Sequence, residues 1–145
     1  MTNLVDSHQQ DLNPFEIVTI GLENMKTKYP LQVALPAVMT EINQPNAKTE
    51  KIGNTFFVVL TGDDGQGFFK AFNADVPMNY VENSKQFCIW AKEELGMHLL
   101  VTEFEDPVIS KLFHIIAQDP PMKGMGFKEY KLSNGDSRIV LNLGE

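Results

Sequence analysis

Two carboxylates, Glu103 and Glu105, flank the end of an apolar run over residues 97–104 and are the first candidates for acid–base chemistry. A carboxylate held at the end of a strand can accept a proton from an amine and so turn the amine into a nucleophile. The alternative is that both are solvated carboxylates, and we favour it because acidic side chains are mostly exposed. Glu103 is therefore a candidate base that needs support from its surroundings.

The other reactive residue types form no recognisable metal or nucleophile motif. His98 and His114 are too far apart for a local metal site, and each lies among apolar residues. Cys88 has helical spacing relative to core residues, which predicts an unreactive buried thiol. Residues 63–65, Asp-Asp-Gly, lack the alternating ligands of a calcium loop and are predicted to form a turn. We expect no metal ion.

Composition narrows the class of protein. The chain has 145 residues, 43% hydrophobic and 21% charged, which is typical of one globular domain. A net charge of −7 without a basic cluster disfavours nucleic-acid binding. No apolar run has the roughly 20 residues of a membrane span, and no signal-peptide pattern is present. With its single cysteine, we expect a cytoplasmic protein with a flexible leader over residues 1–12 and one domain over residues 13–145.

The first half of the domain is predicted to hold two helices and a hairpin. Asn13, Pro14 and Glu16 form a capping signal for a helix that stops at Tyr29-Pro30. Its apolar stripe is predicted to be Phe15, Val18, Leu22 and Met25. A second helix fits residues 36–43, or Pro36 lies inside a longer helix that begins near Leu31. Residues 44–51 are a polar connection, and residues 54–60 and 66–73 form a hairpin around the turn at 61–65.

The phenylalanines of this hairpin constrain what covers it. Consecutive strand residues point to opposite faces, so Phe56 and Phe57 cannot share a face, and neither can Phe68 and Phe69. Either helices cover both faces of the sheet, or one row of phenylalanines meets a partner. The first alternative is the commoner arrangement.

The second half alternates helices with strands and ends in a hairpin. The predicted elements are a helix over residues 81–95, a strand over 97–104, a helix opened by Asp106 and Pro107 and broken at 119–121, and strands over 127–132 and 138–143. Asn134-Gly135 between the last two strands is a strong hairpin signal. The helix over 81–95 must cross between strands, which predicts an α/β domain with a mixed central sheet.

Three stretches of this half carry a family likeness: residues 88–104, CIWAKEELGMHLLVTEF, residues 106–113, DPVISKLF, and residues 124–132, GMGFKEYKL. Together they resemble the GNAT superfamily of acetyl-CoA-dependent N-acetyltransferases. The first stretch is similar to the family's third helix and following strand. The second stretch is similar to its fourth helix, and the third to the entry into its closing strand pair. The resemblance implies a GNAT-like mixed central sheet with helices on both faces and a C-terminal β-hairpin.

The resemblance also implies a cosubstrate site. In that family acetyl-CoA lies where two neighbouring parallel strands splay apart, and a glycine-rich loop at a helix N-terminus binds the diphosphate. By this likeness Phe72, Asn73 and Ala74 would offer backbone contacts to acetyl-CoA. A loop over residues 77–84, with Asn79 and Ser84, would cover the diphosphate.

The catalytic groups follow from the same likeness. Glu103 would assist deprotonation of the amine. Many members use a tyrosine as general acid toward the departing thiolate, and Tyr130 could supply that function here. The alternative for Tyr130 is a packing tyrosine on a strand with a hydrated hydroxyl.

Three features depart from the family pattern. The expected diphosphate loop, near residues 75–80, has no glycine and no arginine, contains Pro77, and is flanked by the acids Asp75 and Glu82. Met122 stands where the family's tyrosine is expected. Only two strands are predicted between the second and third helices where the family has three, and none before the first helix.

Two functions from different classes therefore remain open. The chain either transfers an acetyl group from acetyl-CoA to an amine, or it is a noncatalytic protein of this fold that binds another protein or takes part in an assembly. Its partner is accordingly an amine acceptor or a protein, and a homodimer stays open. The compact size and altered loop would also suit a small viral (phage) or mobile-element protein.

Overall fold

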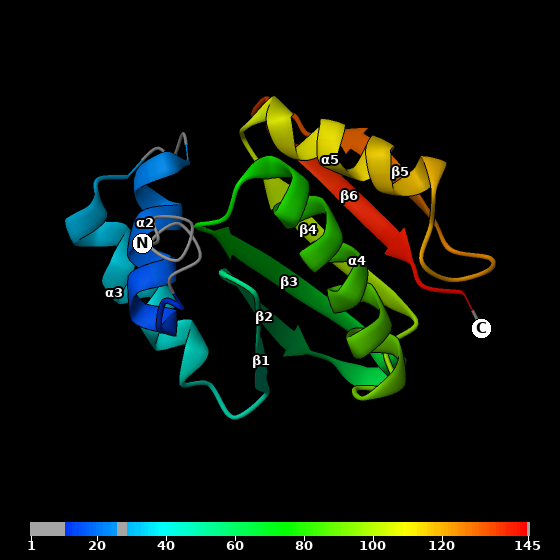
Figure 1. The fold of residues 1–145 in the computed structure, drawn as a ribbon, viewed down its shortest axis with the longest axis horizontal. Coiled ribbons are helices and arrows are strands. Elements are labelled where there is room, and N and C mark those ends of the chain that lie inside the picture. The colour runs from blue at the N-terminus through cyan, green and yellow to red at the C-terminus, as the bar shows by residue number, and fades with distance from the viewer. Residues whose placement is uncertain (1–10, 26–28, 145) are drawn as a thin grey trace, which may run out of the picture.

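A computed structural model describes residues 11–25 and 29–144 as one six-stranded sheet with helices on both faces (Figure 1). The strand order is β1-β2-β3-β4-β6-β5, and only β3 and β4 pair in parallel. The elements in chain order are α2 (Pro14–Asn24), α3 (Leu31–Ile42), β1 (Ala47–Ile52), β2 (Thr55–Thr61), a 3-10 turn (Asp63–Gly65), β3 (Gln66–Asn73), α4 (Pro77–Glu93), β4 (Leu99–Phe104), α5 (Pro107–Gln118), β5 (Gly126–Lys131) and β6 (Ser137–Asn142). The predicted mixed sheet and C-terminal hairpin are confirmed.

The two helical layers create two cores. Helices α2 and α3 pack on one face of the sheet around Phe56 and Phe72. Helices α4 and α5 pack on the other face around Phe57 and Phe69. The ring of Phe57 stacks on that of Phe87 in α4, with 4.2 Å between centroids and 5° between planes. Helices therefore cover both faces at Phe56 and Phe57, the first of the two alternatives for this hairpin.

Helix α2 begins as predicted but buries a different face. The Asn13 side chain accepts a hydrogen bond from the Glu16 amide, and the Glu16 side chain accepts one from the Asn13 amide. The buried residues are Ile17, Val18, Gly21 and Leu22, whereas Phe15 is 54% exposed, so the predicted stripe is wrong at its ends. Gly21 explains the rotation, because a Cβ at this position would lie 3.0 Å from the Cβ of Phe72. Its bare Cα allows α2 to approach β3 closely.

Before α4, the structure decides between the two alternatives for α3 and differs from prediction at β1. Helix α3 begins at Leu31 and contains Pro36, which is the longer alternative. The prediction that residues 44–51 form a connection is wrong, because Ala47–Ile52 is strand β1. Its sequence is polar because β1 lies at the edge of the sheet, where charged side chains are favourable. Three strands thus lie between α3 and α4, which removes the departure from the GNAT pattern at this point. The expected departure before the first helix concerns residues that lie largely outside the described ones.

Helix α4 begins earlier than predicted. It starts at Pro77 rather than at Val81, so the expected loop over residues 77–84 is wrong and its residues form two turns of helix. Pro77 occupies a first-turn position, where its missing N–H is no loss, and no glycine interrupts the turn. The Asp106 cap of α5, which accepts a hydrogen bond from the Val108 amide, is confirmed.

Part of the predicted N-terminal leader lies within the described residues. Residues 1–10 of the predicted leader lie outside the described residues. Asp11 forms an ion pair with Lys51, and the Leu12 amide donates to the Asn54 side chain at 3.0 Å. None of the described helices has the length and apolar character needed to cross a membrane.

The Phe57–Phe87 stack predicts where the fold is most sensitive. Replacing Phe87, which is 1% exposed, by alanine should lower the free energy of unfolding by about 3–5 kcal/mol, because it leaves a cavity beside its three aromatic neighbours, Phe57, Phe69 and Trp90. The matched change Phe15→Ala should cost no more than about 0.5 kcal/mol. Urea unfolding followed by circular dichroism measures both. Equal losses of unfolding free energy in the two variants would contradict the buried position of Phe87 and the exposed position of Phe15.

Candidate functional site

The sheet opens between its two parallel strands. Strands β3 and β4 are paired only at Gln66–Leu99, Gly67–Leu100 and Phe68–Val101. Beyond these positions residues 69–73 of β3 stay paired with β2, and residues 102–104 of β4 stay paired with β6. The two strand segments therefore present facing edges without a partner between them, and we call this opening the wedge. Unpaired strand edges offer backbone donors and acceptors to a ligand.

A cavity of about 360 Å³ occupies the wedge. Its walls come from both helical layers: Ala34, Ala37 and Val38 lie on the α3 side, and Phe87, Cys88, Leu112 and Phe113 lie on the side of α4 and α5. Phe72 lines it at the end of β3 without closing it. Most of its lining is apolar, as is usual for small-molecule pockets.

The charged groups along the cavity leave an acidic side. Lys70 is neutralised by Glu41, with 2.8 Å between Nζ and Oε1. Glu103 Oε2 accepts hydrogen bonds from Nε and Nη2 of Arg138 at 2.8 and 2.6 Å. Glu105 and Asp106 also line the cavity, and neither forms an ion pair with any described cation. The cavity thus carries excess negative charge at the start of α5.

Two titratable groups inside the cavity are held neutral. Burial raises the pKa of the Tyr80 hydroxyl to about 12, with a further contribution from the negative charge of Asp106. Burial alone raises the pKa of the Cys88 thiol to about 12. Near neutral pH Tyr80 is therefore a hydrogen-bond donor, and Cys88 lacks the thiolate that a nucleophile requires.

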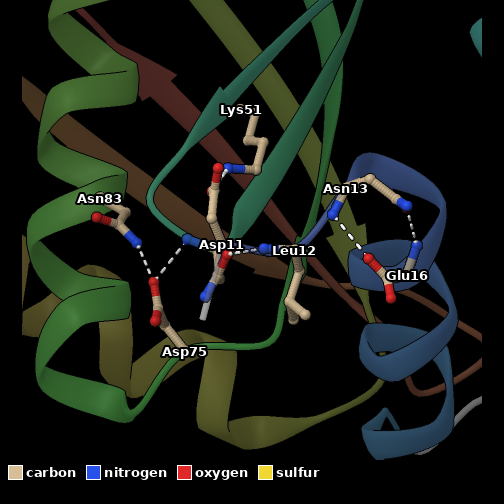
Figure 2. Close-up of polar contacts among 8 residues, drawn as sticks. Asp11, Leu12, Asn13, Glu16, Lys51, Asp75 and Asn83 are labelled. Atoms are coloured by element: carbon tan, nitrogen blue, oxygen red, sulfur yellow. Dashed lines mark hydrogen bonds and ion pairs between the residues drawn. The ribbon is translucent and has the colours of Figure 1, made fainter. Parts of the chain in front are cut away.

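A polar network fixes the connection between β3 and α4 (Figure 2). Asp75 Oδ2 accepts hydrogen bonds from the Asn54 amide and from Asn83 Nδ2 of α4, both at 2.8 Å. The Asp75 amide donates to Asn73 Oδ1 at 3.1 Å, and the Ala74 amide donates to the Asn54 carbonyl at 2.9 Å. The network ties the start of α4 to the turn between β1 and β2. Its backbone donors are consequently already used.

The first turn of α4 contributes few further groups. Pro77 has no N–H, and the Tyr80 amide bonds to the Val76 carbonyl. The amides of Met78 and Asn79 have no carbonyl one turn earlier within the helix, so they are the first-turn donors that α4 offers. No side chain caps this end.

The structure gathers some of the predicted site residues and separates others. Phe72, Ser84 and Glu103 line the cavity. Asn73 at the end of β3, Ala74 in the β3–α4 connection and Asn79 in the first turn of α4 do not line it. Tyr130 is on β5, opposite Arg138, and does not line the cavity. Its neighbour Phe127 packs toward α5, so alternation along the strand directs Tyr130 to the other face.

Tyr80 is the functional candidate that the sequence pattern missed. It lies one turn into α4 and faces the cavity. The signal was Pro77, because a proline at the first position of a helix would have placed Tyr80 on a helix rather than in a loop. Within residues 11–25 and 29–144, no group of three or more His, Cys, Asp or Glu side chains could hold a metal ion.

Several solved structures share the overall fold of this chain. A mutant of the spermidine N-acetyltransferase from Vibrio cholerae matches 89% of this chain and 88% of its own, with a TM-score of 0.55 and 9% identity. The N-acetyltransferase PseH from Campylobacter jejuni matches 91% and 92%, with a TM-score of 0.52 and 14% identity. A proposed acetyltransferase from Salmonella typhimurium, solved with its cofactor acetyl-CoA, matches 90% and 87%, with a TM-score of 0.51 and 10% identity. The chain has the GNAT fold. No protein-family model and no curated protein sequence matches it.

The resemblance to the GNAT family predicts an acyl donor at the wedge, and the connection between β3 and α4 differs from the family pattern there. The diphosphate loop of the family pattern is replaced by the polar network of Asp75 and by the helical turn that begins at Pro77. At identities of 9–14% the likeness shows the shared fold alone, so the chemistry has to be argued from this chain's own groups.

The buried thiol predicts a dependence of stability on pH. The pKa of Cys88 rises from 9.0 to about 12 on folding, so between these values the unfolded chain loses this proton while the folded chain keeps it. The contribution of Cys88 to the free energy of unfolding is therefore constant below about pH 9. Above about pH 9 the free energy of unfolding falls by up to about 1.4 kcal/mol per pH unit. Urea unfolding from about pH 8 to about pH 10 should show a smaller decline in Cys88→Ala. If the free energy of unfolding declines equally with pH in the unmodified protein and in Cys88→Ala, the raised pKa of Cys88 would be contradicted.

Proposed function

We propose that this chain binds the acyl-pantetheine arm of acetyl-CoA in the wedge and transfers the acetyl group to an amine. The observation that supports this proposal is the wedge itself, in which unpaired strand edges border an open cavity of about 360 Å³. A pantetheine arm is a narrow chain with two amides, which suits backbone edges on either side. A bound thioester supplies the activated acetyl group.

The cavity fits this arm better than it fits the rest of acetyl-CoA. Apolar walls and backbone edges suit the arm, with Phe72 and Asn73 at the end of β3 and Ser84 on α4 as its proposed neighbours. The Ala74 amide already donates to Asn54, so Ala74 can offer only its carbonyl group. For the diphosphate the chain offers the amides of Met78 and Asn79, and no arginine or lysine lies in the first turn of α4.

Acid–base chemistry would be divided between carboxylates and one phenol. Glu103 and Glu105, which line the cavity, would take the proton that an attacking amine must lose. The pKa of Tyr80, about 12, is above that of an ordinary thiol. Tyr80 would therefore stabilise negative charge that develops in the cavity by donating a hydrogen bond, without giving up its proton. A cysteine acyl-enzyme is not part of the proposal, because the Cys88 thiol stays protonated.

A second candidate is a noncatalytic protein of this fold that binds another protein. The observation that favours it is the start of α4, where Asp75 and its network replace the glycine-rich loop. In this case neither acetyl-CoA nor its arm would bind. Ligand binding therefore separates the two candidates before any acceptor amine is known.

Obstructing the cavity provides the first test. Ala37 lines it from an exposed position on α3, so Ala37→Trp should narrow the cavity and weaken binding of S-acetylpantetheine by about tenfold or more. Val33→Trp on the same helix lies outside the lining and should change affinity by less than about twofold. Isothermal titration calorimetry measures both. If neither acetyl-CoA nor S-acetylpantetheine binds the unmodified chain at millimolar concentration, the acyltransferase proposal is wrong.

Two tyrosines can then be compared. Tyr80→Phe should reduce kcat by about 100-fold with little change in donor affinity, because one donor to developing charge is lost. The loss should be equal at about pH 7 and pH 9, since the hydroxyl remains protonated at both. Tyr130→Phe, on the other face of β5, tests the alternative suggested by the family pattern. Thiol release in the presence of a panel of primary amines gives the rates, and a loss seen only in Tyr130→Phe would assign the role to Tyr130.

A further inference from the structure

We infer that this site recognises its acyl donor only as far as the pantetheine arm, so that nucleotide-free acyl-pantetheine thioesters are its donor class. The inference rests on the proposed function and narrows it. Three features of the β3–α4 connection, residues 74–76, and of the first turns of α4 carry it: a reduced number of free backbone donors, negative charge, and a lysine that is paired with other carboxylates.

Two of the backbone donors next to the start of α4 are already used, which leaves the amides of Met78 and Asn79 in its first turn. The amides of Ala74 and Asp75 donate to Asn54 and Asn73, and Pro77 has none. A diphosphate site of the glycine-rich kind relies on several adjacent free amides that converge on the anion. The β3–α4 connection instead points these groups into the protein.

Negatively charged side chains lie around the β3–α4 connection, where the family pattern would have the diphosphate bind. The Asp75 carboxylate lies between the β1–β2 turn and α4, and its Oδ2 is held by Asn54 and Asn83 rather than by a cation (Figure 2). Glu82 follows in the second turn of α4, and Asp106 lies close enough to Tyr80 to raise its pKa. An anionic nucleotide would be repelled at this place, and salt would screen the repulsion.

The nearest lysine on α4 does not compensate. Lys85 Nζ lies 3.0 Å from Asp119 Oδ2 and 3.7 Å from Glu82 Oε2, so it is committed to two carboxylates. The cavity, by contrast, offers apolar walls and strand edges that match the arm. Donor affinity should accordingly come from the arm, and the nucleotide should add little or oppose binding.

The test compares three donors on the full chain: acetyl-CoA, S-acetylphosphopantetheine and S-acetylpantetheine. Calorimetry should give S-acetylpantetheine an affinity equal to that of acetyl-CoA within about threefold, or higher. Raising the salt concentration should strengthen acetyl-CoA binding and leave S-acetylpantetheine unchanged, because only the former is repelled. Weak binding of S-acetylpantetheine, about tenfold or more below acetyl-CoA, would overturn the inference while leaving the acyltransferase proposal standing.

A charge-only variant sharpens the comparison. Asp75→Asn keeps an oxygen acceptor for the Asn54 amide and Asn83 but removes the charge. It should improve acetyl-CoA binding by about threefold and leave S-acetylpantetheine unchanged, whereas Asp63→Asn, in the turn before β3, should alter neither. An equal change for both donors would count against the inference. Failure of all three donors to bind would overturn the proposed function and this inference together.

Discussion

The structure depends on the short junction between the parallel strands β3 and β4, which pair at only three positions. The sheet consists of two antiparallel halves, β1-β2-β3 and β4-β6-β5, joined through three paired positions of a short parallel ladder. Such a junction would be weak alone, and helix α4 reinforces it. Phe87 of α4 stacks on Phe57 of the first half, and the same core continues to Leu100 and Ile139 of the second half. Because the helix supplies the cohesion, the strands are free to diverge, and the wedge can stay open without loss of the fold.

The position of α4 is in turn set by polar contacts at its start. Asn83 of α4 donates to Asp75 Oδ2 and to Thr55 Oγ1. Thr55 of β2 in turn donates to Asn73 Oδ1 of β3 at 2.8 Å, so α4, β2 and β3 meet in one network. A half-buried network of this kind is stabilising only when its members are satisfied. Satisfying them uses the amides of Ala74 and Asp75. The interactions that position α4 therefore also limit what the β3–α4 connection could offer to a ligand in the proposed function.

Local signals predicted much of this fold. The capping box at Asn13, the cap at Asp106, the hairpin at Asn134-Gly135 and the bounds of β3 all depend on residues within a few positions of one another. Strand β1 was missed because an edge strand need not be apolar, and the start of α4 was missed because Pro77 was interpreted as a loop residue. The wedge could not be predicted from residue patterns alone, since it depends on where pairing ends between strands separated by a whole helix.

The chemical character of the cavity follows from its position between two cores. Burial keeps both Tyr80 and Cys88 neutral, which removes the thiolate needed for a covalent intermediate and leaves the phenol as a donor. The charged groups remain at the rim: Glu103 is engaged by Arg138, and Glu105 and Asp106 lie at the start of α5. In the proposed function, an apolar, neutral interior would favour a neutral acyl chain, and an acidic rim would attract an amine while it repels a nucleotide. Direct transfer between two bound partners is the proposed chemistry that such a distribution of charge would support.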